Sequence, residues 1–188
     1  AFVSNQNIYC DTVGYSAGNT ITGGLGYNTG GGIFANLLIG PSAQPMYVKK
    51  VRPTIATGTA VTGNTIKGVL LNAAGVIIDS TALYTIVAGD LGLPVELTFI
   101  NGNIDISGDS VYYGFRQNAN TVTGYFPLAT QSAFIVLPNK YCGFNTFGGG
   151  FFTDTQFGVF MIAAVVKAGI NLTSNATNGS ICSATPLN

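Results

Sequence analysis

The chain has 188 residues, which is enough for one domain with a sizeable hydrophobic core. Seven basic and seven acidic residues give a net charge of zero, and only 7% of the residues are charged, against about 25% in ordinary soluble domains. This balance excludes a typical nucleic-acid-binding protein, which needs clustered Lys and Arg, and the 47% of hydrophobic residues excludes a disordered chain.

Low charge also favours association between copies of a protein. The one local basic cluster, Lys49, Lys50 and Arg52, is too short to steer a polyanion.

The most apolar stretch, residues 157–166, is too short for a membrane helix, which needs about 20 residues. The chain begins without a signal-peptide pattern, so we expect the numbering of a secreted protein to begin after processing.

Short stretches in which apolar residues recur at every second position, bounded by Gly, Pro and Asn, are typical of half-buried β-strands. In chain order these stretches are residues 8–10, 33–39, 46–52, 65–71, 76–78, 83–87, 95–99, 111–116, 124–128, 133–137 and 156–166. Only residues 80–91 could form a helix instead of a strand, and their Thr, Tyr, Ile and Val residues are poor helix formers.

This pattern predicts an all-β protein, an antiparallel β-sandwich of jelly-roll type. We expect an extended N-terminal segment over residues 1–20, the sandwich over residues 21–167, and a polar C-terminal tail or linker over residues 168–188.

The alternation also predicts which side chains face the core. Ile66 and Leu70 fall on one face of their strand, whereas Val69 falls on the other. Residues 72–75 supply a turn that ends in a glycine, which can adopt a positive φ. We expect Leu70 and Phe115 to point into the core.

No catalytic centre is recognisable. Because the chain contains no histidine, Ser-His-Asp and Cys-His catalysis are excluded, and a structural zinc site is not expected. The seven acidic residues are mostly isolated at strand ends or turns, whereas a glycosidase needs two facing carboxylates. Asp154 or Glu96 could pair with another acidic residue across the fold. The glycine-rich residues 22–32 lack the lysine of a phosphate-binding loop. We expect no enzyme and no cofactor.

A calcium ion is the one metal that the sequence could accommodate. Asp105 and Asp109 flank a glycine bend and place oxygen ligands at alternate positions, but the remaining carboxylates of an EF-hand loop are missing. The alternative, which we favour, is a plain turn in which the aspartates cap the backbone.

Aromatic side chains could form a platform on which sugars stack, because tyrosine offers a flat face and a hydroxyl. The candidates are Tyr27, Tyr112, Tyr125, Phe144 and Phe147. The alternative is that Tyr112 or Tyr113 packs in the core and that the phenylalanines fill a subunit contact. Trp, the commonest stacking residue, is absent.

The three cysteines, Cys10, Cys142 and Cys182, allow at most one internal disulfide and leave one thiol. The alternative is that all three are reduced and buried. The C-terminal tail contains N-x-S/T sequons at Asn171, Asn175 and Asn178, which are candidate glycosylation sites in a host that glycosylates asparagine.

Several stretches together resemble β-sandwich domains of secreted proteins from Bacteroidota. They are the glycine loop at residues 22–27 with the strand that follows at 33–37, the central pieces at 66–75, 84–86 with 90–91, 112–115 and 124–128, and the last strand at 157–164. The resemblance implies export by the type IX route and a surface, adhesin-like or matrix role. It also implies O-glycosylation at Asp-Ser/Thr-apolar sites, for which Thr12 and Ser110 are the candidates.

We therefore expect a non-enzymatic structural or adhesive protein, extracellular or on the cell surface, that assembles into a filament or array of identical subunits. The alternative is a carbohydrate-binding module of a larger secreted protein, with cell-surface or matrix polysaccharide as its partner. We expect association through the chain ends, residues 1–3 and the polar tail, because an extended segment can add a strand to a neighbour's sheet edge.

Overall fold

The structure is a computed structural model that describes residues 12–168 except 17, 28–29, 43–44, 103, 119–124, 133–141, 147–151 and 154–157. It is all-β, as predicted, and its sheets are antiparallel. Two short 3-10 turns, η1 (Thr59–Val61) and η2 (Ala88–Asp90), interrupt the strands. The described residues contain no helix that is long and apolar enough to cross a membrane.

The strands form three sheets. The four-stranded sheet has the order β1 (Thr12–Gly14), β13 (Ile162–Ala168), β4 (Met46–Pro53) and β7 (Leu97–Thr98). The six-stranded sheet has the order β11 (Phe152–Thr153), β10 (Cys142–Thr146), β3 (Gly32–Ile39), β8 (Ser110–Gln117), β5 (Thr65–Asn72) and β6 (Ile77–Thr85). The three-stranded sheet has the order β12 (Val159–Phe160), β9 (Leu128–Gln131) and β2 (Gly23–Leu25).

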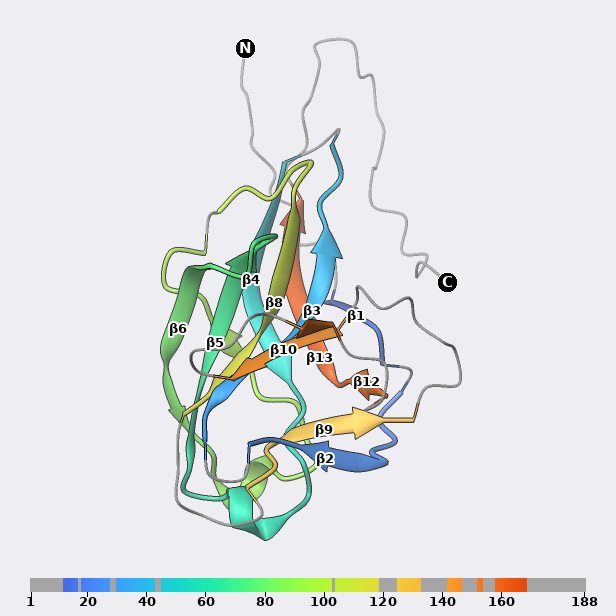
Figure 1. The fold of residues 1–188 in the computed structure, drawn as a ribbon, viewed down its shortest axis with the longest axis vertical. Helices are drawn as coiled ribbons and strands as arrows, with labels where there is room; N and C mark the ends of the chain where they lie inside the picture. The colour runs from blue at the N-terminus through green and yellow to red at the C-terminus, as the bar shows by residue number, and fades with distance from the viewer. Residues whose placement is uncertain are drawn as a thin grey trace, which may run out of the picture.

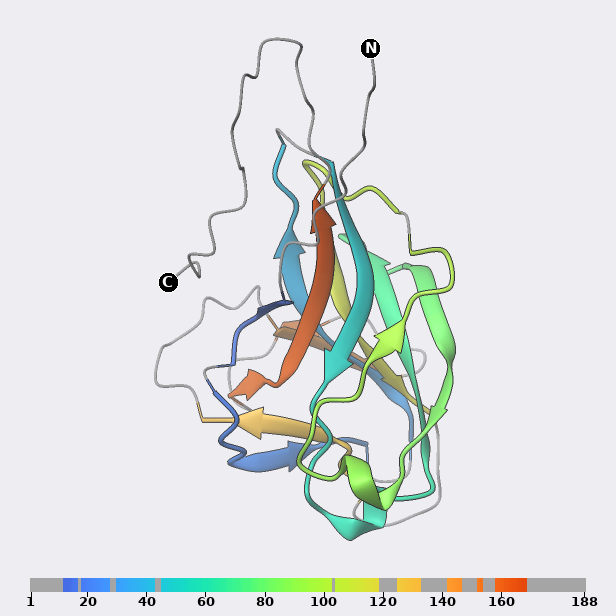
Figure 2. The same ribbon diagram turned by 180° about the vertical axis from the view of Figure 1, so that it is seen from behind.

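The two larger sheets pack against each other. Strands β4 and β13 lie behind β3, β8 and β5 in Figure 1 and in front of them in Figure 2. One cluster of buried side chains joins them, with Val48 and Val51 from β4 and Phe34 from β3 among its members. This arrangement is consistent with a β-sandwich.

Side chains alternate between the two faces of the six-stranded sheet as the sequence predicts. Ile66, Leu70 and Phe115 belong to the core cluster and are fully buried. Val69 and Leu71 point to the opposite face, where they join a smaller cluster. The predicted inward orientation of Leu70 and Phe115 is confirmed.

The β5–β6 hairpin contains the predicted turn. The backbone N–H groups of Ala74 and Val76 both donate to Oδ1 of Asn72, each at 3.0 Å. Gly75 has a φ of 79°, a conformation that costs a residue with a Cβ atom and suits glycine.

Residues 80–91 form no α-helix. Strand β6 continues to Thr85, and only the single turn η2 follows. That turn is held by the carboxylate of Asp90, which accepts hydrogen bonds from the Val87 N–H and the Tyr84 hydroxyl, both at 2.8 Å.

Several strands differ from their predicted bounds. The pieces expected at residues 76–78 and 83–87 form the single strand β6, and the strand expected at 156–166 is divided into β12 and β13. The strand expected at residues 95–99 narrows to β7, although the Val95 and Phe99 N–H groups donate to the carbonyls of Pro53 and Lys49 in the same register on either side of it. The strand expected at 124–128 begins only at Leu128, the first residue of β9. The predicted strands at residues 8–10 and 133–137 lie outside the described residues.

Strand β1 lies within the segment that was expected to precede the sandwich. Thr12, Val13 and Gly14 pair with Val165, Ala164 and Ala163 of β13. The four-stranded sheet therefore already includes residues 12–14.

Candidate functional site

Two of the proposed sugar-stacking tyrosines face inward. Tyr125 is 0% exposed and belongs to the core cluster, so its ring offers no face to a ligand and this part of the prediction is corrected. Tyr27 is half-buried, with its ring stacked on Phe34 at a centroid separation of 4.9 Å. The side-chain amide of Gln117 accepts from the Tyr27 N–H and donates to its carbonyl, which fixes the loop in place.

Among the described side chains, that of Tyr112 is not brought together with these tyrosines. Tyr112 is half-buried on the opposite face of the six-stranded sheet, against the small cluster that includes Val69. Its neighbour Tyr113 is fully buried, so it is the tyrosine of this pair that packs in the main core. Phe144 lies in β10, where only the backbone is described, and Phe147 lies outside the described residues.

Burial changes the acidity of several tyrosines. Loss of water raises the pKa values of Tyr27 and Tyr125 above the usual value, and burial followed by the hydrogen bond to Asp90 raises the pKa of Tyr84. In each case the folded state favours the neutral phenol.

We expect an alkaline titration of the folded protein to leave Tyr27 and Tyr125 neutral at pH values where exposed tyrosines, with a pKa of about 10, have ionised. The pKa of each of these tyrosines is higher in the folded protein than in the unfolded chain. The contribution of the neutral phenol to the free energy of unfolding is therefore complete below the unfolded pKa and is lost as the pH rises above that value. Tyrosinate absorbance and unfolding, followed in one titration, test this. If all nine tyrosines ionised near pH 10 while the protein remained folded, the assigned burial would be wrong.

The segment proposed for calcium is a turn. Oδ1 of Asp105 accepts the backbone N–H of Ser107 at 2.9 Å and also the Ser107 hydroxyl, and these bonds lower the pKa of the Asp105 carboxyl. Gly108 has a φ of 73°, and Asp109 is exposed. The capping interpretation is confirmed for Asp105. Within the described residues, no three His, Cys, Asp or Glu side chains gather as metal ligands would.

Of the candidate glycosylation sites, Thr12 is exposed in β1 and Ser110 is half-buried at the start of β8. Asn171, Asn175 and Asn178 lie outside the described residues, as do Cys10 and Cys182. Cys142 begins β10, of which only the backbone is described.

A different feature appears along β6, the last strand of the six-stranded sheet. Large apolar side chains are exposed on this strand and on the segments next to it. We call this set the β6 rim: Val76, Ile77, Leu83, Val87 and Ile100. Ile100 belongs to it because its N–H donates to the carbonyl of Ser80 at 3.0 Å.

Strand β6 itself contributes no exposed charged side chain to the β6 rim. The one charged residue of β6, Asp79, is 5% exposed. Its carboxylate turns inward and accepts hydrogen bonds from Gly102 N–H at 3.0 Å and Asn101 Nδ2 at 3.2 Å. Edge strands usually carry exposed charges that prevent pairing with other chains. On β6 the middle of the outer side is instead occupied, because Thr81 bridges Phe99 and the Ser80 carbonyl accepts the Ile100 N–H.

Sequence reasoning did not single out the β6 rim. The signal was present, because residues 76–89 contain one charged residue among many β-branched and aliphatic ones. Whether that stretch formed a central or an edge strand depends on the sheet order, which the pattern of the sequence does not specify.

Comparison with known proteins gives no family for the chain. No family model matches it, and no curated protein matches it significantly.

Proposed function

We propose that this chain is a non-enzymatic structural or adhesive protein of the cell exterior, a jelly-roll sandwich that assembles with copies of itself. The resemblance to secreted sandwich domains and the low charge support this proposal. The chain ends that we expected to mediate assembly are residues 1–3 and the tail at 168–188, and all of these except Ala168 lie outside the described residues. The β6 rim provides a surface within the described residues.

The observation that carries the proposal is the set of exposed apolar side chains on the β6 rim. Leu83 and Ile100 are 60% and 68% exposed. The nearest charge in the sheet is Lys67 of β5, which is the cross-strand partner of Leu83. A second copy that covered the β6 rim would remove these side chains from water.

The expected strength of this contact is modest. Fully burying one such side chain contributes about 1.5–3 kcal/mol, so covering the exposed half of each contributes about 1 kcal/mol. Association itself costs at least about 4 kcal/mol. One contact through the β6 rim is therefore weak, and a stable assembly needs repeated contacts, as in a filament or array.

The carbohydrate-binding alternative has less support from the aromatic side chains. Tyr125 is enclosed in the core, and one face of the Tyr27 ring lies against Phe34.

We expect Leu83→Lys to shift the purified protein from assemblies to monomers, because a charge placed on the β6 rim must lose its hydration when a second copy covers it. Light scattering over a concentration series measures the change. Ile39→Lys is the matched control, since Ile39 is 61% exposed but lies on β3, with β8 and β5 between it and β6.

A wild-type chain that remained monomeric at high concentration would contradict the proposed assembly. Equal loss of assembly in both variants would show that added charge, and not the position on the β6 rim, is responsible.

A further inference from the structure

The chain contains two Asn-Gly pairs, Asn101-Gly102 and Asn178-Gly179. An asparagine that precedes glycine is especially prone to deamidation, because glycine has no Cβ atom to hinder ring closure. The backbone nitrogen of the glycine attacks the side-chain carbonyl carbon of the asparagine, and ammonia leaves. Water then opens the succinimide ring to give aspartate or isoaspartate. Of the two pairs, Asn101-Gly102 lies within the described residues.

In the folded protein, one carboxylate holds both groups that would react. The Gly102 N–H, which contains the attacking nitrogen, donates to Oδ2 of Asp79 at 3.0 Å. The side-chain nitrogen of Asn101, which would leave as ammonia, donates to Oδ1 of Asp79 at 3.2 Å. Ring closure therefore requires that Gly102 and Asn101 first give up their hydrogen bonds to Asp79.

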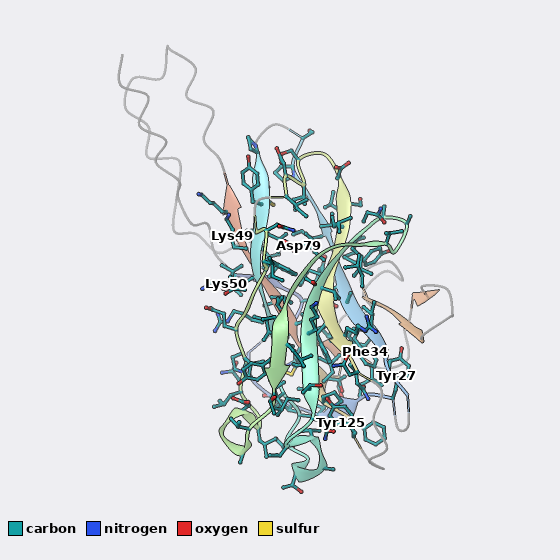
Figure 3. The ribbon with its side chains drawn as sticks, turned by 90° about the vertical axis from the view of Figure 1, so that its left-hand side faces the viewer. Tyr27, Phe34, Lys49, Lys50, Asp79 and Tyr125 are labelled. Carbon is teal, nitrogen blue, oxygen red and sulfur yellow. The ribbon has the colours of Figure 1, made fainter. Side chains whose placement is uncertain are left out.

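The surrounding structure fixes this arrangement. Asp79 is 5% exposed, and its Oδ1 also accepts the Ser80 N–H at 2.7 Å. Just before Asn101, the Ile100 N–H donates to the Ser80 carbonyl, so the segment is bound to β6. Gly102 is buried, whereas Asn101 is exposed to the water that would open the ring. Figure 3 views the molecule from the side on which β6 lies, with Asp79 labelled.

The charge of Asp79 opposes the reaction as well. The attacking species is the deprotonated amide nitrogen of Gly102, and its negative charge would form beside a carboxylate oxygen. A hydrogen bond from the N–H favours the protonated amide, and a like charge nearby disfavours the anion. The ring-closed intermediate places a further negative charge on the side-chain oxygen of Asn101, and an ionised carboxylate has no proton to donate to it.

We propose that Asn101 is a modification site, at which the side-chain amide is converted to a carboxylate, and that Asp79 blocks this reaction while residues 99–102 stay on β6. Opening of that segment breaks the hydrogen bonds to Asp79 and permits the reaction. The net change is the consumption of one water molecule and the release of one ammonia molecule for each asparagine converted.

Conversion would change the β6 rim. The new carboxylate would replace an amide that donates to Asp79, so two negative charges would meet where a hydrogen bond now lies. Asp79 is buried, and like charges in such a place repel strongly. The segment could not return to β6 unchanged, and Ile100 would leave the rim. This effect on assembly rests on the proposed function, whereas the control of the reaction by Asp79 does not.

The test follows the conversion of Asn101 in the full chain during incubation in mildly alkaline buffer, by peptide mapping and mass spectrometry. Asn178-Gly179 is the internal reference, because the same dipeptide reacts in the same sample. In denaturant we expect the two pairs to react at similar rates. Folding should slow Asn101 at least about tenfold, the effect of one hydrogen bond to a charged group. Hydrogen exchange should show a protected Gly102 amide proton.

Asp79→Ser should accelerate the conversion of Asn101 at least about tenfold in the folded protein, for the same reason. Asp90→Ser is the matched control, because the Asp90 carboxylate also accepts two hydrogen bonds in a turn, from Val87 and Tyr84. Circular dichroism checks that both variants fold. If Asp79→Ser does not fold, the wild-type rates with and without denaturant and the exchange of the Gly102 amide proton decide the question.

Three results would each overturn the proposal. They are a folded wild-type rate at Asn101 as fast as the rate in denaturant, an unchanged rate in Asp79→Ser, and equal acceleration by Asp90→Ser. Rapid exchange of the Gly102 amide proton in the folded protein would do the same.

Asn101→Asp tests the effect on assembly, and light scattering should show fewer assemblies than in wild type. Asn19→Asp is the matched control, since Asn19 is also exposed and the change adds the same charge. Equal effects of the two variants would overturn the link to the β6 rim. A wild-type chain that is monomeric would contradict the proposed function, while the rates at Asn101 would still test the role of Asp79.

Discussion

Phe115→Ala is expected to destabilise the protein by about 3–5 kcal/mol, the range for removing a buried phenylalanine ring. Phe115 is fully buried in β8, and its ring centre lies 5.7 Å from that of Phe34. Phe34 in turn meets Phe160 edge to face at 5.9 Å. Loss of the Phe115 ring would therefore leave a cavity and also remove an aromatic contact worth about 0.5–1.5 kcal/mol.

Denaturant titration of the purified variant measures this effect. The matched control is Phe126→Ala, because Phe126 is 39% exposed and outside the core cluster. We expect the control to lose less than half as much stability. A loss below about 1 kcal/mol in Phe115→Ala would contradict the assigned core, since even shortening Ile to Val costs about that much.

The success of this assignment from sequence has a simple physical basis. Side chains of a strand alternate between faces, so one apolar set such as Ile66 and Leu70 identifies the core side of the whole strand. The same rule predicted that Val69 points to the opposite face. Local turn chemistry was equally readable, because Asn72 and Gly75 meet the needs of a tight turn by themselves.

Features that depend on contacts between residues far apart in the sequence could not be predicted from the alternation within one strand. Tyr125 has the flat ring and the hydroxyl of a residue that could bind sugars at an exposed site. Only the packing of the sheets shows that its side chain is enclosed. Asn36 is polar but fully buried, because its side-chain amide donates to the carbonyls of Phe160 and Ile162 at 3.2 Å and 3.0 Å. These partners lie at the other end of the chain.

The β6 rim follows the same division. The sequence contains the apolar residues of β6, but not their place in the fold. Strand β6 is the last in the order of the six-stranded sheet, and its outer side meets residues 99–100, which follow β7. Charge and hydrophobicity are local properties, whereas sheet order is set by the packing of the whole chain.

Sheet order also explains the requirement for glycine at residue 114, in the middle of the six-stranded sheet. Gly114 pairs with Ala35 of β3 on one side and with Val69 of β5 on the other. A Cβ atom at this position would lie 1.9 Å from the Phe34 carbonyl oxygen and 2.6 Å from the Ala35 Cα. Both atoms belong to the backbone, so rotating a side chain cannot relieve the overlap.

We therefore expect Gly114→Ala to destabilise the protein by about 3 kcal/mol or more, at the upper end of the range for overpacked sites. Replacing glycine by alanine restricts the unfolded chain and by itself stabilises by about 0.4–1 kcal/mol, so the steric cost must exceed this gain. Gly58→Ala is the control, because a Cβ atom there meets nothing within 4 Å and Gly58 has an ordinary φ of −68°. Denaturant titration should place the control within about 0.5 kcal/mol of wild type or slightly above it. If Gly114→Ala were as stable as Gly58→Ala, strands β3 and β8 could not be as close as the register requires.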